Sequence, residues 1–212
     1  MYLDSPQPPN LPFSPIEFSS QYQEQLNNAL RLYFNRLSNV TKYLLGPEGG
    51  QYLNMPFAEF FDTTDQIAAS TTAANVINFS NTTLSNGITT QNSNKIVFEY
   101  GGVYNLQYSI QLANDDNATQ DIDIWFSKNG TNESNSNRRY GLSPRKSSGD
   151  PYHTVACANY TNSFVANDYV QLNWRTSNTA AYLEHYTASA SPTRPAVPSV
   201  IVTATFVSSV PE

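Results

Sequence analysis

The feature that most constrains this chain is a long succession of short β-type segments after residue 55. Between Met55 and Pro211, alternating or β-branched runs are separated by Asn, Gly, Ser and Pro. Such runs are typical of strands, and the residues between them are typical of turns. No helical pattern interrupts them, so we predict one mainly β domain, an antiparallel jelly-roll sandwich over residues 57–212. Strands are expected near Phe57–Phe61, Asn75–Phe79, Gly87–Thr90, Lys95–Glu99, Gly102–Leu112, Gln120–Lys128, Tyr152–Phe164, Asp168–Arg175, Tyr182–Tyr186 and Ser199–Val207.

Two dipeptides in this region are signals for tight turns. Gly101-Gly102 and Asn129-Gly130 both predict β-hairpins, because these residues accept the positive φ of two-residue turns. The polar segment Thr131–Asp150 is predicted to be a long loop.

The segment 1–18 differs in composition from the rest, because it is rich in proline. Proline fixes φ and removes a hydrogen-bond donor, so we expect an extended segment without a core of its own. A spacer would not need large apolar side chains, which favours an arm that docks on another protein, although a spacer remains the alternative. The proposed docking residues are Tyr2, Leu3, Leu11, Phe13, Ile16 and Phe18.

Residues 19–45 have the pattern of a helix with one apolar seam. Apolar residues recur at alternating steps of four and three, which is the heptad spacing of a coiled coil. We therefore predict a short coiled-coil stem, and the alternative is a single amphipathic helix lying on its own domain. Glycine and proline end the helix and form a predicted hinge over 46–56. The seam consists of Leu26, Leu30, Tyr33, Leu37, Val40 and Leu44.

Charge and cysteine content exclude several classes of protein. The net charge is −6 and only 13% of residues are charged, which argues against binding to bulk nucleic acid. One cysteine allows no intrachain disulfide.

No segment has the length and apolarity of a membrane span, and the first residues lack the pattern of a signal peptide. We expect no membrane insertion.

Seven stretches of the β region occur in the order of a known family. They begin at Phe57, Leu84, Gly102, Asp121, Lys128, Asn167 and Pro198. With them, the region resembles the C1q/TNF-like trimeric jelly-roll domain, in the version common in environmental bacteriophage virion proteins. This resemblance implies a homotrimer with the last strand near the threefold axis, and it implies no catalysis. Asn167 stands where the family often has glycine, and Thr131–Asp150 is longer and more basic than usual.

The aromatic residues of the domain agree with a trimer. Their number exceeds what one thin sandwich needs, and aromatic side chains are favoured at interface cores. An ordinary core with some exposed tyrosines is the alternative. The residues in question are Tyr100, Tyr104, Tyr108, Tyr169, Trp174, Tyr182, Tyr186 and Phe206.

The sequence offers no convincing catalytic constellation. His153 and Cys157 share a strand but stand too far apart to interact, and small neighbours suggest that Cys157 is a buried, inert thiol. His185 is expected at a surface or interface. We predict no enzyme activity and no cofactor.

Two charged clusters were considered as binding sites. Asp115, Asp116, Asp121 and Asp123 offer oxygen ligands for Ca²⁺, and a solvated acidic turn is the preferred alternative. A basic group in the predicted loop offers a contact for an acidic glycan or a neighbouring virion protein, and a solvated loop is again the alternative. This group is Arg138, Arg139, Arg145 and Lys146.

An arm, a stem and a knob form the layout of a projection. The leading hypothesis is a trimeric phage protein of the virion surface, as a capsid decoration, head fibre or small tail fibre, with host-surface adhesion by binding a glycan or receptor as a further role. The alternatives are a secreted C1q/TNF-like binding or lectin module and, with less support, a glycan depolymerase.

Overall fold

The structure is a computed structural model that describes residues 6–45 and 55–209. The chain divides into two compact units, residues 1–54 and 55–212, and each is described by itself. The predicted arm residues Tyr2 and Leu3, and all but the end of the predicted hinge, lie outside the described residues.

The first unit is a helix with an extended segment beside it. Helix α1 covers Ser20–Leu45. Ser19 caps its start, because its hydroxyl accepts a hydrogen bond from the amide of Tyr22 at 3.3 Å. Residues 6–15 have neither helix nor strand, as their prolines predict. Part of this segment, around Pro8 and Pro9, lies against the helix near Ala29.

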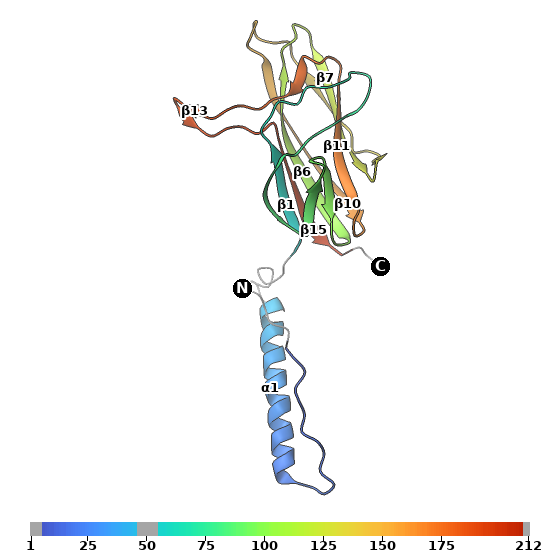
Figure 1. The fold of residues 1–212 in the computed structure, drawn as a ribbon, viewed down its shortest axis with the longest axis vertical. Helices are drawn as coiled ribbons and strands as arrows, with labels where there is room; N and C mark the ends of the chain where they lie inside the picture. Colours follow the sequence, from blue (N-terminus) through green and yellow to red (C-terminus); the bar gives the residue numbers. More distant parts are fainter. Residues whose placement is uncertain (1–5, 46–54, 210–212) are drawn as a thin grey trace. The chain divides into compact units, whose positions relative to one another are not determined.

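The second unit is mainly β, with antiparallel sheets, as predicted (Figure 1). One sheet, here called sheet A, has the strand order β10-β6-β15-β1-β3, with β12 beside one end of β6. Its strands are β1 (Phe57–Asp62), β3 (Asn81–Asn86), β6 (Gly102–Asn114), β10 (Tyr152–Phe164), β12 (Ala181–Leu183) and β15 (Val200–Ser208).

The other sheet, sheet B, has the order β4-β5-β11-β7-β8, with β2 beside β11 and β9 beside β7. A separate pair, β13 with β14, projects from the sandwich (Figure 1). These strands are β2 (Asn75–Val76), β4 (Ile88–Gln91), β5 (Lys95–Phe98), β7 (Gln120–Lys128), β8 (Thr131–Asn132), β9 (Arg138–Leu142), β11 (Tyr169–Thr176), β13 (Ser189–Ala190) and β14 (Thr193–Arg194).

The alternating sequence pattern explains how the sheets pack. In β6, Tyr104, Leu106, Tyr108 and Ile110 point inward and are buried, while Asn105, Gln107 and Ser109 alternate with them and point outward. Inward-facing residues of both sheets join one hydrophobic cluster. Burial of apolar side chains between the sheets therefore stabilises the unit.

The two predicted hairpins have different outcomes. Asn129 and Gly130 have φ of 50° and 81° and join β7 to β8, so this prediction is confirmed. The prediction for Gly101-Gly102 is wrong, because β5 and β6 belong to different sheets. Gly102 is needed for space, since a Cβ there would lie 2.5 Å from the Phe206 ring.

The prediction of a long loop over 131–150 is also wrong in part. Arg138–Leu142 forms strand β9 and pairs with β7. Leu142 is fully buried, so one inward-facing residue anchors a segment that otherwise looks polar. Arg138 and Arg139 therefore lie on a sheet, whereas Arg145 and Lys146 lie in the loop that follows β9.

Candidate functional site

Three apolar side chains of the arm, those of Phe13, Ile16 and Phe18, are the most exposed large apolar groups among the described side chains of residues 6–45. Phe13 is 99% exposed, Ile16 105% and Phe18 88%, while Leu11 is 46% exposed. Isolated apolar residues are common on surfaces, but a contiguous group of large ones marks an interaction site. This segment has the chemistry of a docking surface.

The predicted seam of α1 is only partly covered within its own unit. Leu26, Leu30, Tyr33 and Val40 are half-buried, whereas Leu37 and Leu44 are 37% and 39% exposed. Phe34 and Leu37 line an open groove along the helix with Thr41. The helix therefore has apolar surface left for a further partner.

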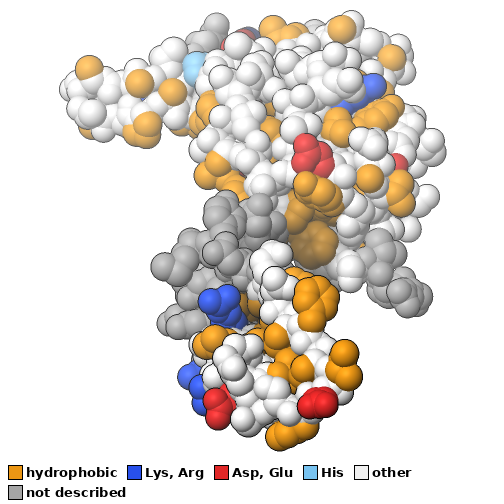
Figure 2. Space-filling view, turned by 60° about the horizontal axis from the view of Figure 1, so that its bottom comes forward, with side chains coloured by type: hydrophobic (Ala, Val, Ile, Leu, Met, Phe, Trp, Pro, Cys, Tyr) orange, Lys and Arg blue, Asp and Glu red, His pale blue; other side chains and the backbone are white. Residues whose placement is uncertain are grey.

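The outward face of sheet A lacks charged side chains along three neighbouring strands, β10, β6 and β15. Register places Ser109 between Cys157 and Ile201 on this face, and Gln107 beside Thr203. None of the outward residues of β6, β10 and β15 is Asp, Glu, Lys or Arg. A shallow hollow of about 270 Å³ lies at its centre. Few charged side chains appear on the face of the β unit that Figure 2 draws.

Cys157 is exposed on this face, so the prediction of a buried thiol is wrong. Its neighbour Ala156 points inward and is fully buried, which directs Cys157 outward by strand alternation.

Several of the aromatic residues assigned to a trimer interface belong to the core instead. Tyr104, Tyr108 and Trp174 are at most 3% exposed. Tyr104 makes edge contacts with Phe164 and Phe206. For these residues the alternative of an ordinary core is the correct one, while Tyr100 is 58% exposed.

The four aspartates considered for Ca²⁺ bind different partners. Asp115 lies 3.6 Å from Arg145, and Asp116 accepts hydrogen bonds from the side-chain amides of Gln120 and Asn178 at 2.6 and 2.7 Å. Asp121 is exposed, and Asp123 is bound by Arg139. Among residues 6–45 and 55–209, no group of three or more His, Cys, Asp or Glu side chains is placed to hold a metal ion.

The basic group is not a single patch. Arg139 donates to both oxygens of Asp123, with Nε–Oδ1 2.8 Å and Nη2–Oδ2 3.1 Å, and these bonds lower the pKa of Asp123 against the opposing effect of burial. Lys146 pairs with Asp150 at 3.4 Å. Arg138 donates to main-chain carbonyls of its own segment. Residues that the sequence assigns to separate acidic and basic clusters therefore form ion pairs with each other in the fold.

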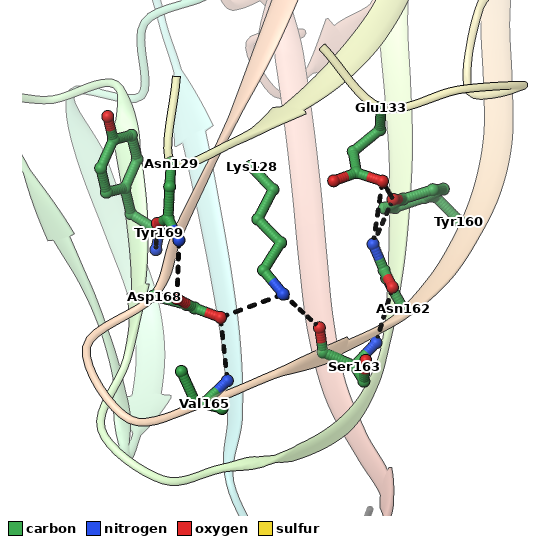
Figure 3. Close-up of polar contacts among 9 residues, drawn as sticks. All are labelled: Lys128, Asn129, Glu133, Tyr160, Asn162, Ser163, Val165, Asp168 and Tyr169. Atoms are coloured by element: carbon green, nitrogen blue, oxygen red, sulfur yellow. Dashed lines mark hydrogen bonds and ion pairs between the residues drawn. The ribbon is translucent and has the colours of Figure 1, made fainter. Parts of the chain in front are cut away.

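Asp168 anchors the junction between β7 and β11 (Figure 3). Its carboxylate accepts hydrogen bonds from the Asn129 side chain at 2.7 Å and from the Val165 amide at 2.9 Å, and it lies 3.1 Å from Lys128 Nζ. Burial acts to raise the pKa of Asp168, but these contacts outweigh it and the pKa lies below its ordinary value. Asn167, beside it, has a φ of 69°, which asparagine tolerates better than most residues.

A second polar cluster in Figure 3 centres on Glu133. Its Oε2 accepts hydrogen bonds from the Tyr160 hydroxyl at 2.9 Å and from the Asn162 amide at 3.2 Å. Burial, followed by this bond to Glu133, raises the pKa of Tyr160. The hydroxyl therefore stays protonated and acts as a structural donor.

His153 belongs to a cluster with Glu184 and Tyr186. Its Nδ1 lies 2.8 Å from Glu184 Oε2, and the Tyr186 hydroxyl donates to the same oxygen at 2.6 Å. Burial raises the pKa of Tyr182 to about 12, and nearby Glu184 adds to this effect. His153, Glu184 and Tyr186 include no nucleophile. Their contacts hold the segment after β12 on sheet A.

No family model matches the chain, and no curated protein matches it. Within the described ranges, no helix combines the length and apolarity needed to cross a membrane. Function therefore has to be argued from the surfaces described above.

One partly exposed aromatic residue, Trp125, was missed in the sequence. Trp125 points outward from β7, between the buried Ile124 and Phe126, and lines a hollow on sheet B. An aromatic residue at a position whose strand neighbours point into the core was the available signal.

Proposed function

We propose that the protein is a trimeric structural protein of a bacteriophage virion surface. Its arm attaches to the particle, α1 forms a short coiled-coil stem and the β unit is presented as a knob. A capsid decoration, a head fibre and a small tail fibre are the positions that fit this role. The phage origin rests on the sequence resemblance described above.

We further assign the β unit to the jelly-roll fold. The first long strand, β1, lies beside the last, β15, and β6 and β10 complete the same sheet. The other principal strands, β5, β11, β7 and β9, form the opposite sheet. This alternation between two sheets is the arrangement expected of two Greek keys, which supports the assignment.

The observation that carries the trimer is the outward face of β6, β10 and β15 in sheet A, which has no Asp, Glu, Lys or Arg, while Glu59 of β1 lies at its margin. Interface cores are depleted in charged residues relative to other surfaces. A second and third copy of the chain are the occupants that we assign to this face, with β15 near its centre. Half-exposed Ile201 and exposed Val155 supply apolar area there.

The exposed arm supports attachment to another virion protein. Phe13, Ile16 and Phe18 are almost fully exposed, and covering such side chains is favourable by about 1.5–3 kcal/mol each. An extended proline-rich segment also loses less entropy on binding than a flexible one.

The test uses a variant in which Phe13, Ile16 and Phe18 are all replaced by Ser. We expect it to keep the wild-type mass in solution and to be absent from purified particles. A control with Asn10→Ala and Ser14→Ala should load normally. Normal loading of the triple variant would refute the arm as the anchor.

A further inference from the structure

A hollow of about 360 Å³ lies on the outward face of sheet B, the sheet opposite the proposed trimer contact. Its volume falls in the range of small-molecule sites. It combines one aromatic ring with charged groups and amides from four strands or their connections. The lining residues are Asp123, Trp125, Asn132, Glu133, Asn137, Arg139 and Arg175.

The aromatic wall of this hollow is held in a fixed orientation. Trp125 is half-exposed, and its indole Nε1 donates a hydrogen bond to Asn132 Oδ1 at 2.8 Å. Asn132 belongs to β8, which the tight turn at Asn129-Gly130 places beside β7. A rigid, accessible indole is a good surface for the C–H face of a sugar ring, because it offers apolar area at little entropic cost.

The charged wall leaves one guanidinium without a hydrogen bond. Register places Arg175 and Arg139 on either side of Asp123, one on β11 and one on β9. Arg139 occupies both oxygens of Asp123, which is 6% exposed. Arg175 is exposed, and within the described part of the chain its side chain makes no hydrogen bond and no close ion pair, although its charge helps to lower the pKa of Asp123. Its planar donors match a carboxylate in a bidentate geometry.

The remaining lining groups suit hydroxyls. Arg139 uses Nε and Nη2 for Asp123, so the N–H groups of Nη1 remain for a ligand. Glu133 uses Oε2 for Tyr160 and Asn162, which leaves Oε1 as an acceptor. The Asn137 side chain donates to Asp123, which leaves its amide oxygen as an acceptor for a ligand.

We propose that this hollow binds a saccharide that carries a carboxylate, of the uronic-acid type. The sugar ring packs on Trp125, its carboxylate pairs with Arg175, and its hydroxyls bond to Glu133, Asn137 and Arg139. The proposal names a ligand class for the proposed contact with the host surface. It rests on the proposed function only in taking the host surface as the source of the sugar. Since sheet A is the proposed trimer face, the hollow stays accessible in the assembly.

The chain has two tryptophans, and Trp174 is 1% exposed, so a change in fluorescence on ligand addition reports on Trp125. The probes are a trimer of galacturonic acid and the neutral trisaccharide maltotriose, titrated into the full chain. We expect saturable quenching by the acidic probe, at least about tenfold weaker binding of maltotriose, and weaker binding of the acidic probe at high salt.

Variants identify the site. Arg175→Gln should weaken the acidic probe about tenfold and remove the preference over maltotriose. Trp125→Ala should abolish binding, measured by ligand-observed NMR because the reporter is lost. Arg194→Gln and Tyr100→Ala, which alter an exposed arginine and an exposed aromatic ring elsewhere in the unit, are the matched controls and should bind as wild type.

Three results would overturn the proposal: no binding of the acidic probe, equal binding of both probes, or wild-type binding by Arg175→Gln. Mass in solution, measured on the same samples, reports on the trimer separately. A trimer that binds no saccharide would refute the hollow and leave the proposed assembly intact.

Discussion

Replacing Asp168 with Ala should destabilise the β unit substantially, because this carboxylate is 8% exposed and has three donors. The Val165 amide and the Asn129 amide each lose a charged acceptor, worth about 1.5 kcal/mol apiece at the lower end. The contact with Lys128, whose side chain is 25% exposed and which keeps a bond to the Ser163 carbonyl, adds at most about 1 kcal/mol. The expected loss is about 3–4 kcal/mol, or roughly 10 °C in Tm for a domain of this size.

The effect should depend on pH in a defined direction. The folded-state pKa of Asp168 is lowered, so its contribution is present above the unfolded-state pKa of about 3.9 and is lost as pH falls through the folded value. The difference in Tm between wild type and Asp168→Ala should therefore be full at pH 7 and shrink below about pH 4. Thermal denaturation followed by circular dichroism between these values measures it.

Asp150→Ala is the matched control for this experiment. Asp150 also pairs with a lysine, Lys146, but their side chains are 52% and 59% exposed, so the change should be under about 1 kcal/mol. A Tm for Asp168→Ala within about 2 °C of wild type, or a difference that stays constant with pH, would refute the reasoning.

Three further predictions concern the stem, a turn and the sheet A face. Leu30→Asp or Leu37→Asp should remove the helical circular dichroism signal while trimer mass persists, because a buried unpaired charge costs several kcal/mol. Monomers would mean that the stem drives assembly. Unchanged helicity would mean that the seam makes no contact between helices. Asn167→Ala should lower Tm by about 3 °C, since φ is 69°, whereas Asn167→Gly should not; equal Tm values would contradict the strained turn. Cys157, exposed in the single chain, should react with a maleimide at least about tenfold more slowly in native protein than in urea, and equal rates would place it outside the interface.

Local patterns predicted the elements of the fold better than their pairing. Alternation in β6 and the Asn129-Gly130 turn depend on adjacent residues, and both were predicted from the sequence. Gly101-Gly102 has the residues of a hairpin turn, but the sequence alone does not show that β5 and β6 belong to different sheets. Gly102 instead leaves space for the ring of Phe206, which is distant in the sequence.

The candidate sites were harder to predict, because they depend on which strands become neighbours. Asp123 and Arg139 were assigned to separate acidic and basic clusters, and only the pairing of β7 with β9 brings them together. Cys157 was assigned to the core from its small neighbours, although strand alternation after Ala156 places it outward. Trp125 was overlooked for a similar reason, since its exposure follows from alternation rather than from its residue type.

The central claim is that this chain forms a trimer, and the mass of the purified protein in solution tests it most directly. Static light scattering across the micromolar range should give about three times 23.6 kDa, independent of concentration. Thirty-fold dilution should leave this value unchanged if sheet A and the stem both contribute contacts. A mass of one chain at micromolar concentration would contradict the account, because the uncharged face and the apolar seam would then have no partner in a second copy.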